Sequence, residues 1–204
     1  MILFSLVAVL TVKADDRSAE ILRKMTGLFS SYTSYRIDFR ASMAGEFSNV
    51  PGKLIVSGER YVLDVYDSEI SFDGTTVYNY SKDNEEVILE KPDPGNNALF
   101  ANPTRIFQLY DSDFTHVSKG EVSRGGRTLQ VIELTPRSAG DYDAITLEVD
   151  RATGLPASIA YRMPGLDADV SLAIVSVTPN VSVDNTTFIF DPTKHPGVEV
   201  IDFR

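Results

Sequence analysis

Cysteine and tryptophan are both absent from the 204-residue sequence. Without cysteine the chain cannot form a disulfide, a thiolate zinc site or a thiol nucleophile, and it cannot carry a lipid on an N-terminal cysteine. Basic residues are also few, with 19 Lys and Arg against 29 Asp and Glu, which gives a formal net charge of −10. Because an acidic surface repels phosphate groups, this balance disfavours binding to nucleic acid and to anionic membranes.

Recognisable catalytic motifs are absent too. The two histidines, His116 and His195, come without a G-x-S-x-G nucleophile motif, and the Gly125-Gly126 pair lacks the lysine and helix of a phosphate-binding loop. The acidic residues in 141–150 alternate with apolar ones, which indicates a solvated strand face rather than a metal site. Asp and Glu are plentiful, but nothing selects a catalytic pair, so we expect no enzyme, no metal and no cofactor.

The N-terminus begins with an apolar run, Ile2 to Val12, that is too short to cross a bilayer as a helix. Its length matches the hydrophobic region of a signal peptide, and Val12-Lys13-Ala14 fits a cleavage site before Asp15, although the usual basic start is missing. We therefore expect residues 1–14 to be a cleaved signal peptide and 15–204 to form a single domain. A buried first strand is the alternative.

The hydrophobic periodicity changes once along the chain. Apolar residues recur at steps of three and four from Ile21 to Tyr32, which predicts an amphipathic helix. From Tyr35 onward the period is two, and runs of short strands separated by turn residues favour an antiparallel sheet of about eleven strands, with 186–192 among them. A short mid-chain helix is expected after Pro103.

Apolar and aromatic side chains are in surplus on the strand faces that alternation predicts to be dry. Such a sheet either closes on itself into a packed core or stays open as a cup with an apolar hollow, and the periodicity does not separate the two.

Several segments in order resemble the LolA family of periplasmic lipoprotein carriers. The stretch "FDGTTVYNYSKDNEEV", residues 72–87, resembles the family's D-G-x-x-[LV]-[WY]-x-Y segment. The opening helix followed by "SYTSYRIDFRASM", the strand pair "GKLIVSGERYVLDV", the central 131–161 and the closing "NVSVDNTTFIFDPTKHPGVEVID" follow the family order. The resemblance covers about residues 16–202.

This resemblance implies a mainly β fold, an incomplete antiparallel barrel with an α-helical lid over an apolar cavity. It implies a periplasmic monomer that shields the acyl chains of lipoprotein cargo, which it receives from an inner-membrane ATP-binding-cassette exporter and passes to an outer-membrane receptor. A lipid-sensing or envelope-stress module of the same fold is the alternative. The expected cavity and lid residues are Ile37, Phe39, Leu54, Tyr61, Leu63, Phe72, Tyr78, Tyr80, Ile106, Phe107, Leu109 and Leu147.

The sequence departs from the family pattern at the arginine that ties the lid shut. Gly58 stands where that arginine is expected, and Arg60 is the candidate to replace it from a shifted position. The receptor of the same fold is anchored through a lipidated cysteine, so the absence of cysteine favours a soluble shuttle.

Overall fold

The computed structural model describes residues 8–93, 104, 107, 110–138, 142–165 and 169–204. In chain order, its elements are α1 (Ala8–Ser31), β1 (Ser34–Met43), β2 (Phe47–Ser57), β3 (Arg60–Val65), β4 (Ser68–Phe72), β5 (Val77–Ser81), β6 (Glu86–Glu90), α3 (Tyr110–Asp113), β7 (Phe114–Arg124), β8 (Arg127–Pro136), β9 (Ala144–Asp150), β10 (Pro156–Arg162), β11 (Val170–Pro179), the 3₁₀ turns η1 (Asn185–Phe188) and η2 (Pro192–Lys194), and β12 (Glu199–Asp202).

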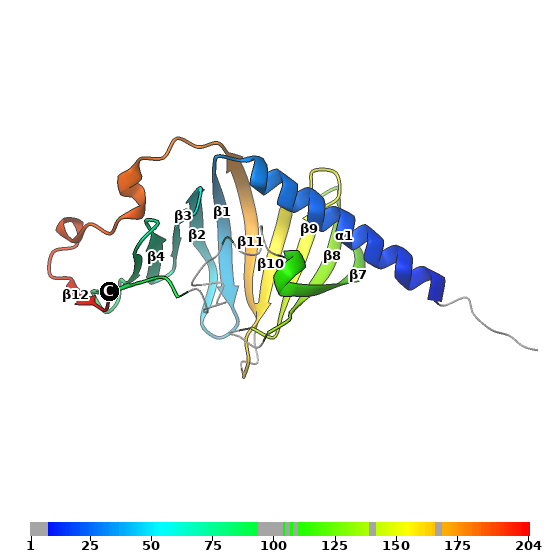
Figure 1. Cartoon of the computed structure of the whole chain (residues 1–204). Coiled ribbons are helices and arrows are strands. Elements are labelled where there is room, and N and C mark those ends of the chain that lie inside the picture. The colour runs from blue at the N-terminus through cyan, green and yellow to red at the C-terminus, as the bar shows by residue number, and fades with distance from the viewer. Residues whose placement is uncertain (1–7, 94–103, 105–106, 108–109, 139–141, 166–168) are drawn as a thin grey trace, which may run out of the picture.

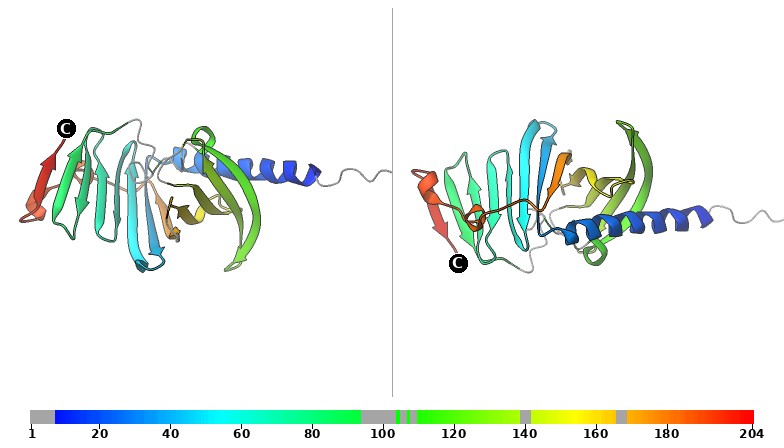
Figure 2. Two further views of the ribbon diagram at one scale, coloured as in Figure 1. Left: turned by 90° about the horizontal axis from the view of Figure 1, so that it is seen from below. Right: turned by 90° about the horizontal axis from the view of Figure 1, so that it is seen from above.

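The strands form one 12-stranded sheet in the order β12-β6-β5-β4-β3-β2-β1-β11-β10-β9-β8-β7. Two meanders, β1 to β6 and β7 to β11, are joined where β1 pairs with β11. Every pairing is antiparallel except that of β12 with β6. The edge strands β12 and β7 do not pair with each other, so the sheet is curved but unclosed, as Figures 1 and 2 show.

Helix α1 covers only one half of the sheet. Its apolar side chains Ile21, Leu22, Met25 and Phe29 are buried and fall at helical spacing on one side of the helix. They pack in one cluster with the strand residues Ile132, Leu134, Ile145, Leu147 and Val149. We call the sheet face that carries these residues the inner face. The half formed by β2 to β6 extends beyond the helix (Figure 2).

Polar contacts fix α1 to the turn between β9 and β10. Lys24 Nζ donates hydrogen bonds to the carbonyl oxygens of Ala152 at 2.6 Å and Arg151 at 3.3 Å. Gly154 in this turn has φ +79°, and a Cβ atom there would lie 2.9 Å from Lys24 Cγ, so only glycine suits both the conformation and the contact. The helix is therefore held in place as well as packed.

The chain after β11 covers the other face of the sheet, which we call the outer face. Phe190 packs there with Tyr78, Tyr80, Val87 and Leu89 in a second buried cluster. This segment returns along β3 to β6 and ends in β12 at the sheet edge (Figure 1). In the β3–β6 half, the outer face thus packs against the C-terminal segment, while the inner face extends beyond α1.

The prediction of a strand over 186–192 was wrong. Asp184 and Asp191 accept hydrogen bonds from the backbone N–H groups of Thr186 and Thr193, at 2.8 and 3.0 Å, and these side-chain caps start the turns η1 and η2. Phe188 and Phe190 are nonetheless both buried, while Ile189 between them is 47% exposed. The spacing of two that indicated a strand reflects this burial.

The expected fold class is confirmed, with twelve strands where about eleven were expected. Strand β12 and its parallel pairing were not expected, whereas the expected strand over 186–192 is absent from the sheet. The expected mid-chain helix falls largely outside the described residues, and the parts of it that the structure describes, Phe107 and α3, are helical. Helix α1 begins at Ala8, so the expected cleavage point after Ala14 lies within a continuous helix, and the signal peptide stays a prediction.

Candidate functional site

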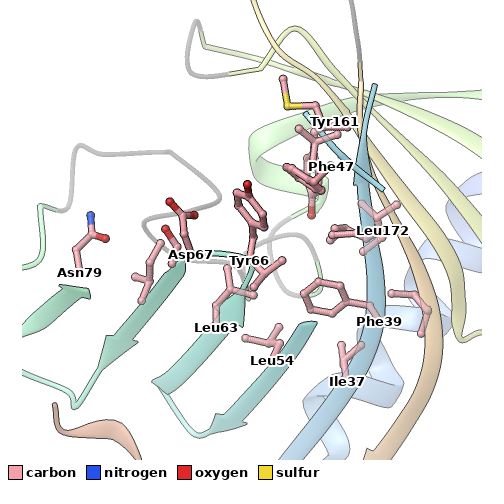
Figure 3. A pocket seen from close by; sticks show the side chains of 18 of the residues that line it. Ile37, Phe39, Phe47, Leu54, Leu63, Tyr66, Asp67, Asn79, Tyr161 and Leu172 are labelled. Atoms are coloured by element: carbon pink, nitrogen blue, oxygen red, sulfur yellow. The ribbon is translucent and has the colours of Figure 1, made fainter. Parts of the chain in front are cut away.

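An apolar cavity of about 380 Å³ lies on the inner face, beside the part of the sheet that α1 covers. Strands β1 to β5, β10 and β11 supply nearly all of its walls (Figure 3). Its lining residues are Ile37, Phe39, Ala41, Met43, Phe47, Leu54, Leu63, Val65, Tyr66, Asp67, Ser68, Ile70, Asn79, Phe107, Ile159, Tyr161, Val170, Leu172 and Ile174. This volume is near the lower end of the roughly 300–1,000 Å³ typical of small-molecule sites.

The strand register explains why these residues share one surface. Ile37 stands directly opposite Leu54, and Leu54 opposite Leu63. Leu63 in turn faces Ile70, and Ile70 faces Asn79. Directly opposed residues of an antiparallel pair point to the same side of the sheet, so this row crosses five strands on the inner face.

Across β1 the cavity wall continues onto β11 and β10. Phe39 is opposite Ile174, and Ala41 is opposite Leu172. Tyr161 on β10 is 9% exposed, and burial, together with the neighbouring Tyr142, raises the pKa of its hydroxyl. The hydroxyl therefore stays protonated at physiological pH and acts as a neutral hydrogen-bonding group.

Phe107 lines the cavity on the side of α1. Its ring stacks on Phe29 of α1 with centroids 4.2 Å apart and meets Tyr35 edge-on at 6.4 Å. The side chain is 2% exposed, yet it lines the cavity. Phe107 therefore contacts both the buried cluster beneath α1 and the cavity.

The turn before β2 and the turn between β3 and β4 border one end of the cavity, which we call its mouth. Phe47 begins β2, and Tyr66 lies in the turn between β3 and β4, and their rings stack with centroids 5.0 Å apart. Tyr66 has φ +56° and is 53% exposed, so a non-glycine residue holds a left-handed conformation here. The next two residues, Asp67 and Ser68, also line the cavity and bring polar groups to its edge.

Five of the twelve expected site residues line the cavity, namely Ile37, Phe39, Leu54, Leu63 and Phe107. Tyr61 and Leu147 belong to the buried cluster of the inner face, and Phe72 packs against that cluster, but none of the three lines the cavity. Ile106 and Leu109 fall outside the described residues. Ligand binding by any of these residues stays a prediction.

The expectation that Tyr78 and Tyr80 lie at the cavity has to be corrected. On β5 it is Asn79 that points to the inner face, so both tyrosines point to the outer face. There Tyr80 contacts Phe190 and His195, with ring centroids 5.0 and 4.6 Å apart. The aromatic residues of β5 were assigned to the wrong face because the segment that covers them is distant in sequence.

Arg60, the candidate lid latch, is also found on the outer face. Its guanidinium lies 4.9 Å from the ring centroid of Phe188, and its Nη1 donates a hydrogen bond to Asn185 Oδ1 at 2.7 Å. These contacts attach the C-terminal segment to β3. They do not involve α1 or Phe107.

Fourteen of the nineteen described lining residues were not among the expected site residues, and two sets of them show why. The alternation in "VSLAIVSV", residues 170–177, carried the signal for Val170, Leu172 and Ile174. The polar residues Asp67, Ser68 and Asn79 carried no signal, because turn residues of this kind are ordinary wherever a chain reverses.

No group of three or more His, Cys, Asp and Glu side chains suited to a metal ion occurs among the residues that the structure describes. Within the same described part, no helix combines the length and the apolar character needed to cross a membrane. Among the lining residues that the structure describes, Asp67 is the one carboxylate. The site is thus built for contact with apolar groups.

Comparisons with known proteins address the fold. No protein-family model matches the chain, and no curated protein matches its sequence. A crystal structure of an uncharacterized conserved protein from Thermus thermophilus is similar over 91% of this chain and 98% of that chain, with a TM-score of 0.60 and 9% identity. An unclosed antiparallel sheet with a helix on its inner face beside an apolar cavity is also what the sequence resemblance implied. The fold is LolA-like.

Two further solved structures carry names of this group. A LolA superfamily protein from Nitrosomonas europaea matches 85% of this chain and 97% of its own, at 12% identity and a TM-score of 0.43. A putative outer membrane lipoprotein-sorting protein domain from Vibrio parahaemolyticus matches 88% and 97%, at 11% identity and a TM-score of 0.46.

Proposed function

We propose that the protein is a carrier that reversibly binds the acyl chain of a lipid or lipoprotein in the inner-face cavity. The observation that supports this proposal is the cavity itself, with about 380 Å³ of space lined almost entirely by apolar side chains. Convergent catalytic groups are not found among its described lining residues. Binding rather than catalysis is therefore the function that the site favours.

The volume suits a single acyl chain. An apolar cavity of roughly 150 Å³ holds benzene, so about 380 Å³ has room for on the order of fifteen carbon atoms. Burying each methylene contributes about 0.8 kcal/mol, which amounts to about 12 kcal/mol before any cost is subtracted. A carrier with that full affinity would not release its cargo.

Phe107 offers a way to reduce this affinity. Its ring occupies the side of the cavity next to α1 while it stacks on Phe29. A long acyl chain that enters has to displace this ring or pass beside it, and lost stacking offsets part of the gain. Binding then becomes reversible, as a carrier requires.

The cellular role that we propose is transport in the periplasm. In this proposal an acylated lipoprotein is the cargo, an inner-membrane ATP-binding-cassette exporter delivers it, and an outer-membrane receptor takes it. The basis is the LolA-like fold combined with the sequence resemblance and the expected signal peptide. A monomer with one cavity satisfies this role.

Neighbouring residues on β11 provide a matched test. Ile174 lines the cavity, whereas Val175 points to the opposite face and is 65% exposed. We expect the protein to bind the uncharged fluorescent probe N-phenyl-1-naphthylamine, and Ile174→Asn to weaken that binding about tenfold or more, because an unpaired amide replaces apolar wall. Val175→Asn should bind as the wild type does, and thermal unfolding checks that both variants are folded.

Native mass spectrometry of the purified full chain supplies the second measurement. Co-purified or added lipid that remains bound in the wild type and is lost in Ile174→Asn supports acyl binding. Equal probe binding by the two variants, or no binding by the wild type, would refute the proposed function.

A further inference from the structure

The cavity has polar side chains at the end that forms its mouth. Asp67, Ser68 and Asn79 line the cavity beside the apolar row of Leu54, Leu63 and Ile70. Figure 3 shows Asn79 and Asp67 at one end of the lining side chains, with Phe39 and Ile37 toward the other. A ligand with an apolar tail and a polar head would therefore place its head at this end.

These polar groups are held in place by the strands around them. Ser68 begins β4 opposite Ser81, and Asn79 is two residues from Ser81 on β5, so Ser68 and Asn79 are diagonal neighbours on one face. The backbone N–H of Lys82 donates to the carbonyl oxygen of Asp67 at 2.7 Å. The turn that carries Asp67 is thus fixed before any ligand arrives.

Asp67 brings a negative charge to this end of the cavity lining. Asp67 is half-buried, and among the described residues no ion pair or hydrogen bond engages its carboxylate. The nearby ammonium group of Lys82 is already held by the carboxylate of Asp64 and by the carbonyl oxygen of Tyr66, the latter at 3.1 Å. Lys53 also pairs with Asp64, at 3.0 Å.

An anionic headgroup would meet the Asp67 carboxylate with no cation among the described lining residues to offset the repulsion. A headgroup that donates hydrogen bonds could instead give them to Asp67, and to the side-chain oxygens of Ser68 and Asn79. Hydrogen bonds to a charged acceptor are stronger than those between neutral groups, so Asp67 should dominate this preference.

On the basis of the proposed acyl binding, we propose that this mouth selects amphiphiles whose headgroup donates hydrogen bonds and carries no negative charge. An amine, a hydroxyl-rich or an amide headgroup fits this chemistry, and a free fatty acid does not. The cavity then distinguishes its cargo from the fatty acids released by lipid breakdown.

The test is competition for the naphthylamine probe on the full chain at neutral pH. Dodecylamine, monododecanoylglycerol and dodecanoate share one chain length and differ in the headgroup, and each is used below its self-association concentration. We expect the amine and the glycerol ester to compete about fivefold or more better than dodecanoate.

Two variants separate the local carboxylate from the overall acidity of the protein. Asp67→Asn should bring dodecanoate to within about twofold of the glycerol ester, because the repulsive charge is gone. Glu69→Gln removes a charge of the same sign two residues from Asp67. Glu69 points to the outer face, because its neighbours Ser68 and Ile70 on β4 point to the inner face, so this variant should keep the wild-type preference. The affinity for the uncharged probe itself should be the same in Glu69→Gln as in the wild type. Competition in each protein is expressed relative to the affinity of that protein for the probe.

The outcomes separate the two proposals. Equal competition by the three amphiphiles in the wild type, or a preference for dodecanoate, overturns headgroup selection while leaving acyl binding intact. An unchanged preference in Asp67→Asn overturns the role of that carboxylate. A wild type that does not bind the probe overturns acyl binding and headgroup selection together.

Discussion

Phe39 packs directly against the backbone of Gly52, its partner across β1 and β2. A Cβ atom at position 52 would lie 2.4 Å from Phe39 Cε2, which is closer than two carbon atoms can approach. An aromatic ring thus covers a glycine on the inner face, and the absence of a side chain at position 52 sets where one wall of the cavity stands.

Gly52→Ala should therefore push the Phe39 ring toward the cavity. We expect a loss of about 1–3 kcal/mol in the free energy of unfolding from overpacking, and weaker binding of the naphthylamine probe. Denaturant unfolding and probe titration measure the two effects. Gly27→Ala is the control, because Gly27 lies on the exposed side of α1 and has nothing within 4 Å of an added Cβ. Alanine at this position should stabilise the protein by about 0.5–1 kcal/mol. An unperturbed Gly52→Ala protein would contradict the packing described for Phe39.

Removal of the Phe107 ring should have opposite effects on stability and on binding. Phe107→Ala is expected to cost about 3 kcal/mol in unfolding free energy, since a side chain only 2% exposed is lost. The probe should bind more tightly, because the cavity no longer contains the ring that a ligand displaces. Phe29→Ala is the matched control: it breaks the same stacked pair, but Phe29 does not line the cavity. Tighter binding in both variants would show that loosening of α1, rather than displacement of Phe107, limits affinity.

The outer-face cluster should support stability without taking part in binding. Phe190 is 7% exposed and contacts Tyr80, so Phe190→Ala is expected to cost about 3 kcal/mol and to speed amide hydrogen exchange across 185–202. Ile189→Ala removes the neighbouring apolar residue, which is 47% exposed, and should change stability by less than about 1 kcal/mol. Both variants should retain the affinity of the wild type for the probe. Weakened binding in Phe190→Ala alone would mean that the two faces are coupled.

Alkaline pH should destabilise the protein through its buried tyrosines. Burial raises the pKa of Tyr61 to about 12 from 10, and burial also raises the pKa of Tyr35 and Tyr161. Because the folded state favours the protonated hydroxyl, this contribution is complete below pH 10 and is lost as the pH rises from 10 toward 12. Tyr61 alone accounts for on the order of 2 kcal/mol of this loss.

Unfolding free energies measured across that range should fall less steeply in Tyr61→Phe than in the wild type. Two curves of the same slope would show that the Tyr61 hydroxyl does not change its protonation equilibrium on folding.

The fold could be predicted from the sequence to the extent that local periodicity determines it. In β1, alternation placed Ile37 and Phe39 on the correct face, because that strand is paired on both sides and its register leaves one dry face. In β5 the same rule identified the alternation but assigned the wrong side to the cavity. Tyr78 and Tyr80 are buried by the segment around Phe190, more than a hundred residues later in the sequence, and no local pattern reports such a contact.

The candidate site was accessible from the sequence in its apolar part only. Leu54 and Leu63 could be anticipated because apolar walls are built from regular strands. Asp67 and Asn79 could not, since their relevance depends on which face and which turn meet at the cavity mouth. The segment 186–192 shows the complementary error: its burial pattern was recognised, whereas the Asp-initiated turns that produce it were not.

The position of the C-terminal segment on the outer face has a consequence for how such a protein can diversify. Strands β3 and β5 contact the C-terminal segment on the outer face and carry cavity-lining residues on the inner face. Substitutions that reshape the binding surface therefore leave the supporting layer untouched. Under the proposed acyl binding, a lineage with this arrangement can exchange one hydrophobic ligand for another by altering alternate residues of the same strands, at little risk to folding.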